Sequence, residues 1–261
     1  MKFSVNSITL LKNLQSISGL ISSKPSLPIL DHFLFSIKNQ ELTVTSSDLQ
    51  TTMTVSMEVI SESDGAIAIP SRRIIDILKT LPDTPITFNI NPENLAVEIT
   101  ADNCKFNDIG QKSEEYPKTP TFKSSNSFTI NSLVLHKIID KTIFATANDE
   151  IKPALQGVFF NVKNNFTDFV ATDSHRLIKY TRHDVKSDQE FSFIMPKKPL
   201  MAIRESLSRN DTIVTVQSNN ENALFSFNNY RLICKLINAK YPNYDAVIPQ
   251  ENPNKLTIDR N

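Results

Sequence analysis

The sequence predicts an α+β protein built from tandem copies of one domain. Residue types recur along the 261-residue chain at a nearly constant offset of about 125 positions, and each copy contains two helix-like segments among several strand-like segments. Isolated matches are expected by chance, but an ordered series at one offset is not. The matching pairs include Phe3 with Phe128, Leu10 with Leu135, Pro28 with Pro153, Leu30 with Leu155, Asp48 with Asp173, and Tyr116-Pro117 with Tyr241-Pro242.

The first copy opens with a short strand, Phe3–Val5, which leads into an amphipathic helix over Ser7–Lys24. Asn6 or Ser7 is a suitable N-cap for this helix. A strand that ends in proline precedes a second helix over Ser71–Leu81, because proline is tolerated in the first helical turn. The strand-like runs between the helices are Phe33–Ile37, Leu42–Ser46, Thr52–Ile60 and Ile67–Pro70, and three more runs close the unit. Two helices with antiparallel strands make an α+β domain.

The second copy repeats this order. It opens with the strand Phe128–Ile130, and its helices are predicted over Asn131–Ala147 and Pro196–Arg209. Its other strand-like runs are Gly157–Val162, Phe166–Ala171, Leu177–Thr181 and Phe193–Pro196, followed by three more. The same architecture is therefore expected twice.

A charged, proline-containing stretch, Lys112–Ser125, is the predicted linker between the copies. We expect one domain over residues 1–122 and a second over residues 123–250. Lys255–Ile258 resembles the strand that opens the second copy, so residues 251–261 are expected to begin a third domain of a longer protein.

Composition indicates a cytoplasmic protein. The 28 basic and 28 acidic residues cancel, so the chain as a whole does not attract polyanions. The N-terminus lacks the apolar core of a signal peptide, and no apolar run is long enough to span a membrane. The two cysteines, Cys104 and Cys234, lie in strand-like segments and are predicted to be buried free thiols, which suits a reducing compartment.

The predicted helices concentrate positive charge. They carry eleven basic and three acidic residues, a net charge of +8, which leaves −8 for the rest of the chain. Such segregation creates a potential that can hold a phosphate backbone without reading its sequence. Solvated basic helix surfaces are also common, so the count alone favours DNA binding and an ordinary surface about equally. Basic residues beside the proline that starts the second helix occur in both copies, which favours DNA binding.

Sites for other chemistry are missing from the sequence. The four glycines form neither a P-loop nor a dinucleotide fingerprint, so no cofactor is expected. The four histidines lack metal-ligand spacing, so no metal is expected. Asp173-Ser174-His175 has residue types found in catalytic triads, but a triad is assembled through space and contiguous residues are poorly placed for a relay. We therefore predict no catalytic residues.

Two motifs resemble those of the bacterial DNA polymerase III beta subunit, the sliding clamp. They are Ala171–Leu177, with the sequence Ala-Thr-Asp-Ser-His-Arg-Leu, and Tyr241–Tyr244, with the sequence Tyr-Pro-Asn-Tyr. The resemblance covers the whole sequence. It implies tandem DNA-clamp domains, each with two helices packed on antiparallel sheets. It further implies three domains per subunit and two subunits joined head to tail around duplex DNA, with the helices lining the hole.

The same resemblance implies a non-enzymatic processivity factor that encircles DNA and tethers its partners. The implied partners are double-stranded DNA, the DNA polymerase III alpha subunit, the clamp loader complex, and other polymerases and repair proteins with clamp-binding peptides. A fragment without most of the third domain is expected to be a monomer. The residues predicted to face DNA are Lys24, Arg72, Arg73, Lys137, Lys141, Lys197, Lys198 and Arg204.

The resemblance also implies a partner-peptide pocket and a subunit interface. Phe106 matches an apolar interface residue of the family. Ser174 and Ala246 replace residues common in the family, so pocket details are expected to differ, and Asp149-Glu150 places acid in a loop that contacts DNA in some relatives. The pocket residues carried over by motif are Leu155, Thr172, His175, Arg176, Leu177, Pro242 and Val247.

Two alternatives remain open from the sequence. A repeat-built protein-interaction scaffold that does not encircle DNA would share the fold and the pocket, while its basic helices would be merely solvated. A hydrolase that uses His175 and Asp173 is the more distant alternative. Aliphatic pocket residues such as Leu155 and Leu177 could also be ordinary core.

Overall fold

The computed structural model describes residues 1–22, 24–102, 104–149, 151–207, 211–249, 251, 254 and 256–259. The first unit contains β1 (Lys2–Asn6), α1 (Ser7–Ser18), β2 (His32–Lys38), β3 (Glu41–Ser47), β4 (Thr51–Glu58), β5 (Ile60–Ser61), β6 (Gly65–Pro70), α2 (Ser71–Thr80), β7 (Pro85–Ile90), β8 (Ala96–Ala101) and β9 (Cys104–Ile109). The second unit contains β10 (Asn126–Asn131), α3 (Ser132–Thr142), β11 (Gly157–Val162), β12 (Thr167–Thr172), β13 (Leu177–Arg182), β14 (Phe191–Pro196), α4 (Lys197–Ser206), β15 (Ile213–Ser218), β16 (Asn222–Phe227) and β17 (Tyr230–Lys235). The α+β prediction is confirmed.

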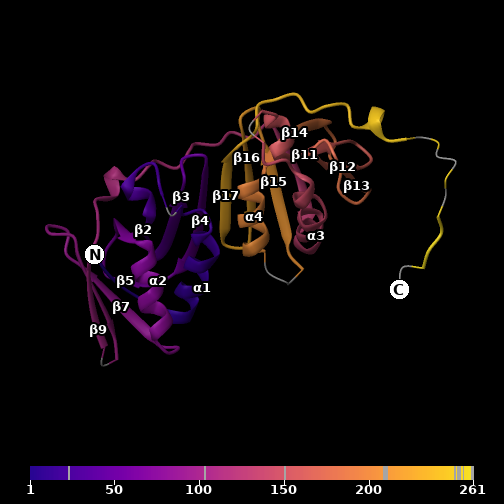
Figure 1. The fold of residues 1–261 in the computed structure, drawn as a ribbon. Helices are drawn as coiled ribbons and strands as arrows, with labels where there is room; N and C mark the ends of the chain where they lie inside the picture. Colours follow the sequence, from indigo (N-terminus) through magenta and orange to yellow (C-terminus); the bar gives the residue numbers. More distant parts are fainter. Residues whose placement is uncertain are drawn as a thin grey trace.

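The strands form three antiparallel sheets, and one of them runs through both units. Its order is β10-β15-β16-β17-β4-β3-β2-β6, so four strands come from each unit. The first unit also has the sheet β5-β1-β7-β8-β9, and the second unit has the sheet β13-β12-β11-β14. Figure 1 shows the two units side by side, with β17 against β4.

The two units repeat one topology. Strands β1-β7-β8-β9 of the first unit correspond to β10-β15-β16-β17 of the second, and β4-β3-β2-β6 correspond to β13-β12-β11-β14. At the offset of about 125 residues, β4 therefore matches β13 and β9 matches β17. Strands β9 and β17 therefore occupy the same edge position in the two units, and so do strands β4 and β13. The joint between the units is the pairing of β17 with β4.

The helices bury their apolar stripes against these sheets. In α1, Leu10, Leu14 and Ile17 are fully buried at helical spacing. The α1 N-cap is Asn6, whose side chain accepts from the Thr9 amide at 2.9 Å, and Asn131 caps α3 in the same way. The second helix of each unit follows a strand that ends in proline, as predicted.

Contacts between side chains and backbone reinforce the joint between the units. Ser206 Oγ on α4 donates to the Ser16 carbonyl on α1 at 2.9 Å. Lys198 Nζ donates to the Leu20 carbonyl at 2.9 Å and forms an ion pair with Asp48. The joint therefore combines a strand pairing on the sheet side with helix contacts on the other side.

Three details differ from the sequence predictions. The first helix ends at Ser18, with Gly19 as its C-cap, so Lys24 lies in the following loop and not on a helix. The observed helices carry nine basic and three acidic residues, a net charge of +6 in place of +8, because they are shorter than predicted and Arg209 lies outside the described residues. Cys104 is exposed on the edge strand β9, so its predicted burial was wrong, whereas Cys234 is buried.

The predicted domain limits at 122 and 123 fall in the extended segment between the 3₁₀ helix Ser113–Glu115 and β10. Of the predicted third-domain start at 251–261, residues 252, 253, 255, 260 and 261 lie outside the described part of the chain. Within the described residues, no helix is long and apolar enough to cross a bilayer.

The ion pair at the joint gives a stability prediction. Lys198→Met should lower the free energy of unfolding by about 1 kcal/mol or less, because the side chains of Lys198 and Asp48 are 48% and 17% exposed and solvent screens the pair. Urea denaturation measures the change. The control is Lys137→Met on α3, an exposed lysine without a described ion pair, which should leave stability within about 0.5 kcal/mol. Equal effects of the two substitutions would contradict a role for the ion pair.

Candidate nucleic-acid interface and peptide pocket

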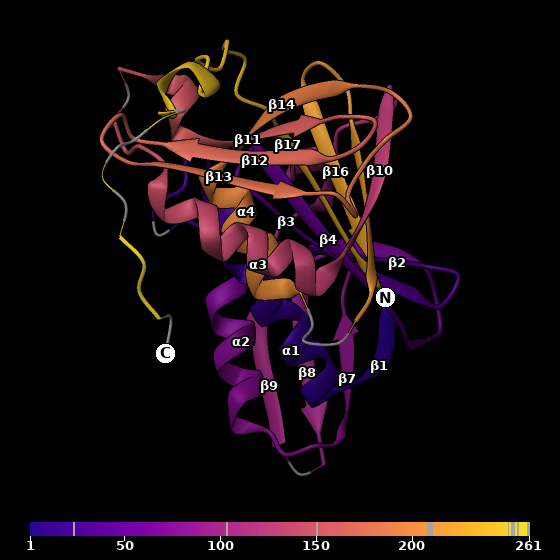
Figure 2. The same ribbon diagram turned by 90° about the vertical axis from the view of Figure 1, so that its right-hand side faces the viewer.

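The four helices form one continuous row across both units. Helix α2 contacts α1, α1 contacts α4 across the joint, and α4 contacts α3. Figures 1 and 2 show the row gathered on one side of the molecule with the strands around it. Basic side chains on this row therefore share one surface that spans the two units.

Several predicted DNA-facing cations lie free at the surface. Lys24, Arg72 and Lys137 are exposed, and in the described residues none of them forms an ion pair. Lys141 is also exposed and lies over the Tyr180 ring, with its Nζ 5.8 Å from the ring centroid. These side chains can approach phosphates without first breaking an ion pair.

The other predicted cations already hold partners. Arg73 pairs with the buried carboxylate of Asp108 at 3.1 Å, and Arg204 on α4 pairs with Asp140 on α3 at 3.2 Å. Lys198 is engaged at the joint, and Lys197 Nζ donates to Asn148 Oδ1 at 3.3 Å. The net effect of Arg73, Lys198 and Arg204 on a phosphate is weaker than a charge count suggests, because a neighbouring carboxylate offsets much of the positive potential of each.

The seven residues predicted for the peptide pocket line a single cavity of about 730 Å³. Leu155 and Leu177 provide apolar walls, while Pro242 and Val247 come from the segment after β17. Val247 is 68% exposed, so it is not core. Ser174, which the sequence analysis named for its effect on the pocket, also lines the cavity. The lining residues that sequence reasoning missed are Lys152, Pro153, Ala154, Ala239, Asn243 and Tyr244. An apolar cavity with a few polar groups suits a short peptide.

A tight loop between β12 and β13 forms one rim of this pocket. Asp173 Oδ1 accepts from the backbone amides of His175 and Arg176, both at 3.0 Å, and Asp173 Oδ2 accepts from Arg176 Nε at 2.9 Å. Ser174 has a φ of 78°, in the left-handed region that favours glycine. Thr172 Oγ1 donates to the Arg176 carbonyl at 2.7 Å and accepts from the Ser174 amide, which closes the loop.

This loop gives no support to the hydrolase alternative. The Asp173 carboxylate is occupied by backbone amides and by Arg176, and no described hydrogen bond joins it to the His175 ring. The corresponding loop of the first unit has the same geometry without a histidine. Asp48 Oδ1 accepts from the amides of Gln50 and Thr51, and Leu49 has a φ of 73°. The aspartate is therefore a turn-forming residue of the repeat.

The remaining predicted positions are placed as follows. Phe106 is half-buried on the edge strand β9, where it packs on the core. Ala246 is exposed in the 3₁₀ helix Asp245–Val247 beside the pocket. Asp149 is exposed and accepts from the Ile151 amide at 2.9 Å, whereas Glu150 lies outside the described residues.

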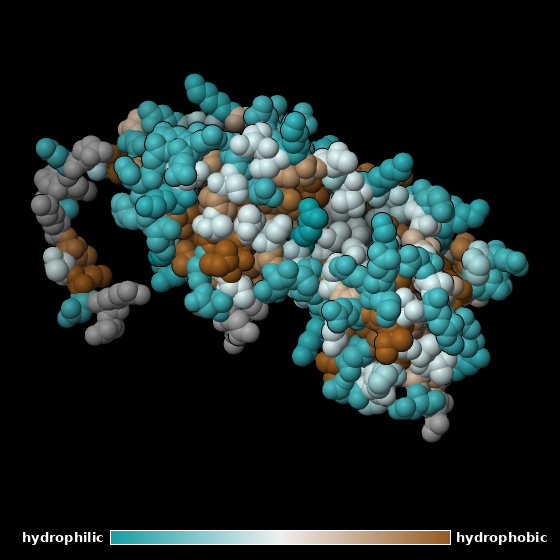
Figure 3. All heavy atoms as spheres, turned by 180° about the vertical axis from the view of Figure 1, so that it is seen from behind, coloured by the Kyte–Doolittle hydropathy of each residue, from teal (hydrophilic) through white to brown (hydrophobic). Residues whose placement is uncertain are grey.

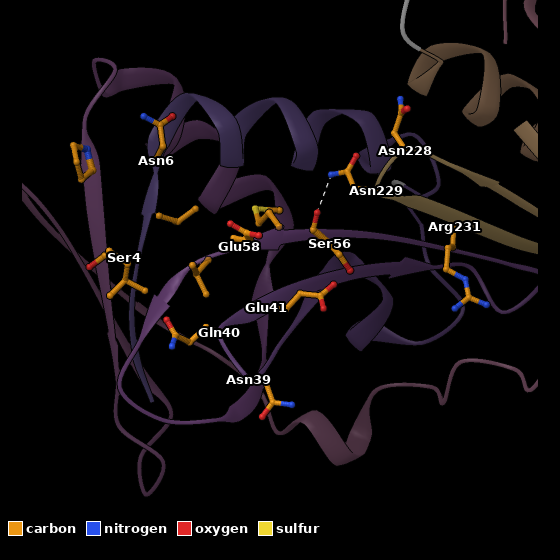
Figure 4. Close-up of a pocket in the computed structure, with 15 residues that line it drawn as sticks. Ser4, Asn6, Asn39, Gln40, Glu41, Ser56, Glu58, Asn228, Asn229 and Arg231 are labelled. Carbon is orange, nitrogen blue, oxygen red and sulfur yellow. Dashed lines mark hydrogen bonds between the residues drawn. The ribbon is translucent and has the colours of Figure 1, made fainter. Parts of the chain in front are cut away.

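A larger groove of about 1160 Å³ lies at the joint, away from the pocket (Figure 4). Its lining is rich in amides, and it includes Asn229, whose side chain donates to the Ser56 carbonyl at 2.8 Å. Glu41 and Glu58 face each other across β3 and β4 in this groove. Size alone does not make a site, and none of the motif residues lies here.

The surface seen from behind is mostly hydrophilic, with apolar side chains gathered in patches on both units (Figure 3).

In the described residues, no group of three or more His, Cys, Asp or Glu side chains is placed to hold a metal ion.

The chain matches two protein-family models. Residues 1–120 match the N-terminal domain of the DNA polymerase III beta subunit, and residues 129–243 match the central domain of that subunit. The chain belongs to the DNA polymerase III beta subunit family. The sequence resemblance to this family is thereby confirmed.

Two relatives with similar sequences are beta sliding clamps. The beta sliding clamp of Haemophilus influenzae is 31% identical over 252 residues, which cover 96% of this chain and 68% of that protein. The beta sliding clamp of Escherichia coli K12 is 28% identical over 257 residues, covering 98% of this chain and 69% of that protein.

Two crystal structures of sliding clamps have the same fold. The DNA polymerase sliding clamp of Bacillus subtilis has a TM-score of 0.91 at 25% identity, covering 96% of this chain and 68% of that one. A DnaN sliding clamp of Pseudomonas aeruginosa bound to griselimycin has a TM-score of 0.90 at 26% identity, covering 97% of this chain and 69% of that one.

The rim loop gives a pH prediction. The amides of Arg176 and His175, the Arg176 amide first, lower the pKa of Asp173 from 3.8 to about 2. A carboxyl with a depressed pKa stabilises the fold fully above its unfolded pKa near 4, and this contribution is lost as the pH falls toward 2. An NMR titration of the Asp173 carboxyl carbon should therefore show little change between pH 7 and pH 3. A midpoint near 4 would mean that the loop does not hold the carboxylate.

Proposed function

We propose that this chain acts as a DNA sliding clamp, the processivity factor of a replicative DNA polymerase. The helix row would face the duplex, and the sheets would form the outer wall. The observation that carries the proposal is the continuous sheet through both units, because one joint fixes all four helices on a common surface. Clamps of this family are polymerase accessory subunits and not enzymes.

The strand edges support a head-to-tail ring. Strand β9 is an edge of the same kind as β17, and β13 is an edge of the same kind as β4. If β9 paired with a strand that matches β4, and β13 paired with a strand that matches β17, the β17–β4 joint would be repeated at both ends of the molecule. A head-to-tail interface that repeats in this way generates a closed ring when the rotation closes. The position of Phe106 on β9 fits its predicted role at the subunit interface.

The pocket supports a second role as a tether. The polymerase III alpha subunit, the clamp loader complex, and other polymerases and repair proteins would each insert a short peptide between the rim loop and the segment 239–247. Leu155 and Leu177 would contact the apolar side chains of that peptide, and Thr172, His175 and Arg176 would orient its polar groups. Replication takes place in the bacterial cytoplasm, which is the location we propose.

Retention on circular DNA tests the encircling role. The protein, loaded with its clamp loader and ATP onto a nicked circular duplex, should co-elute with the DNA in gel filtration. Cutting the circle once should release it, because a ring slides off a free end. Equal retention on circular and linear DNA, or none on either, would favour the scaffold that does not encircle DNA.

The free and paired cations should differ in their response to salt. Replacing Arg72 and Lys137 by Met should reduce the salt slope of duplex binding by roughly 1 for each phosphate that is no longer neutralised. Replacing Arg204 and Lys198 by Met should reduce it less, because these side chains already pair with Asp140 and Asp48. Fluorescence anisotropy at salt concentrations from about 50 to about 200 mM measures the slopes. An unchanged slope in the Arg72/Lys137 variant would remove these residues from the interface.

A further inference from the structure

The segment after β17 returns over the sheet β13-β12-β11-β14, on the face opposite the helices (Figure 1). The inner face carries Phe160 and Phe169 in the main core, whereas the outer face carries Phe159 and Val170, which pack with Tyr241 and Tyr244. The strand register orders the outer face into rows of neighbouring side chains. These rows are Thr172 with Leu177, then Phe159 with Val170 and Lys179, then Asn161 with Asp168 and Thr181.

Two tyrosines attach the segment to successive rows. Tyr241 stacks on Phe159 with ring centroids 4.6 Å apart, and its hydroxyl donates to the Val170 carbonyl at 3.4 Å. Tyr244 reaches the next row, where its hydroxyl donates to Asp168 Oδ2 at 3.1 Å and accepts from Asn161 Nδ2 at 2.9 Å. The ring of Tyr244 also lines the peptide pocket. This residue therefore connects the pocket wall to the centre of the sheet.

Asp168 is a buried carboxylate that does not line the pocket. It is 2% exposed on a strand whose residues are all buried, and a buried charge is costly unless it is paired and hydrogen-bonded. Both of its oxygens are satisfied. Thr181 Oγ1 donates to Oδ1 at 2.6 Å, while Tyr244 Oη and Lys179 Nζ lie 3.1 and 3.3 Å from Oδ2.

Lys179 contacts both Asp168 and the pocket segment. Its Nζ donates to Asp245 Oδ1 at 2.8 Å and lies 5.2 Å from the centroid of the Tyr244 ring. The bond to Asp245 is the largest cause of the raised pKa of Lys179. Two consecutive residues of the pocket segment, Tyr244 and Asp245, are therefore held by one lysine and one buried aspartate.

The first unit provides an internal comparison. It keeps the first anchor, because Tyr116 corresponds to Tyr241 and its hydroxyl donates to the Thr45 carbonyl at 3.4 Å. It lacks the second, since the positions that match Asn161, Asp168, Lys179 and Tyr244 hold Ser36, Thr43, Thr54 and Thr119. In that unit the matching edge strand, β4, is paired with β17, and none of the positions that match the seven predicted pocket residues lines the groove at this joint. The contacts among Tyr244, Asp168 and Lys179 therefore occur in the unit that has the pocket, and the shared fold does not by itself need them.

We propose that Tyr244, Asp168 and Lys179 are positioning residues that hold the 242–247 wall of the pocket in its peptide-binding shape before the peptide arrives. The inference rests on the proposed function of this pocket. Loosening the wall would lower the fraction of molecules ready to bind, and the apparent affinity falls by that fraction.

The test is griselimycin binding to the full chain, measured by isothermal titration calorimetry. Tyr244→Phe keeps the ring in the pocket wall but removes the hydroxyl, leaving Asp168 without one donor. We expect binding about tenfold weaker. Hydrogen exchange at the Val247 amide, which donates to the Tyr244 carbonyl at 3.3 Å, should become about tenfold faster. Lys179→Met should act in the same direction, and Lys179→Arg, which keeps the charge and the donors, should restore most of the affinity.

Two control variants separate the possible failures. Tyr116→Phe removes a buried tyrosine hydroxyl of the first unit, the one that corresponds to the Tyr241 hydroxyl, so it should leave both griselimycin binding and Val247 exchange unchanged. Leu177→Asp should abolish binding by placing a charge in the pocket. Unimpaired binding by Leu177→Asp would overturn the proposed pocket itself. Binding by Tyr244→Phe and Lys179→Met within twofold of the unsubstituted protein, with Leu177→Asp inactive, would overturn only the positioning role.

Discussion

The pairing of β17 with β4 is the interaction on which the rest of this structure depends. It joins two sheets that would each end in an unpaired edge, and it brings α1 against α4 on the opposite side. Because the two strands are antiparallel and paired over five successive residues, the register between the units is fixed by backbone hydrogen bonds. The helix row, and with it any continuous surface for a duplex, follows from this single joint.

Much of this fold could be predicted from the sequence because the chain contains its own comparison. Asp48 and Asp173 match in sequence, and both prove to be turn residues followed by a residue of positive φ. The seven pocket residues, which were predicted from the family resemblance and not from the repeat, also lie together, although they come from three separate stretches of the chain. Local signals repeated twice in one chain constrain each other, which a single copy could not do.

Features that depend on distant contacts could not be predicted in this way. The pairing of Lys198 with Asp48 joins residues 150 positions apart, and charge counting treated both as independent. The early end of α1 had a local signal in Gly19, but the apolar periodicity continued through Ile21 and obscured it. Exposure of Cys104 follows from the place of β9 at a sheet edge, which is a property of the topology and not of the strand.

The attachment of Tyr244 to Asp168 also has a mechanical consequence. A polymerase bound through a peptide in the proposed pocket would pull on the clamp as it advances along DNA, so the force would enter the protein at the pocket wall. Asp168 lies on β12, which is hydrogen-bonded to a strand on each side, and Asn161 and Lys179 extend the attachment to both of them. The load is therefore shared among three strands, and a towed clamp would resist peeling of the 242–247 segment better than one anchored at the edge strand alone.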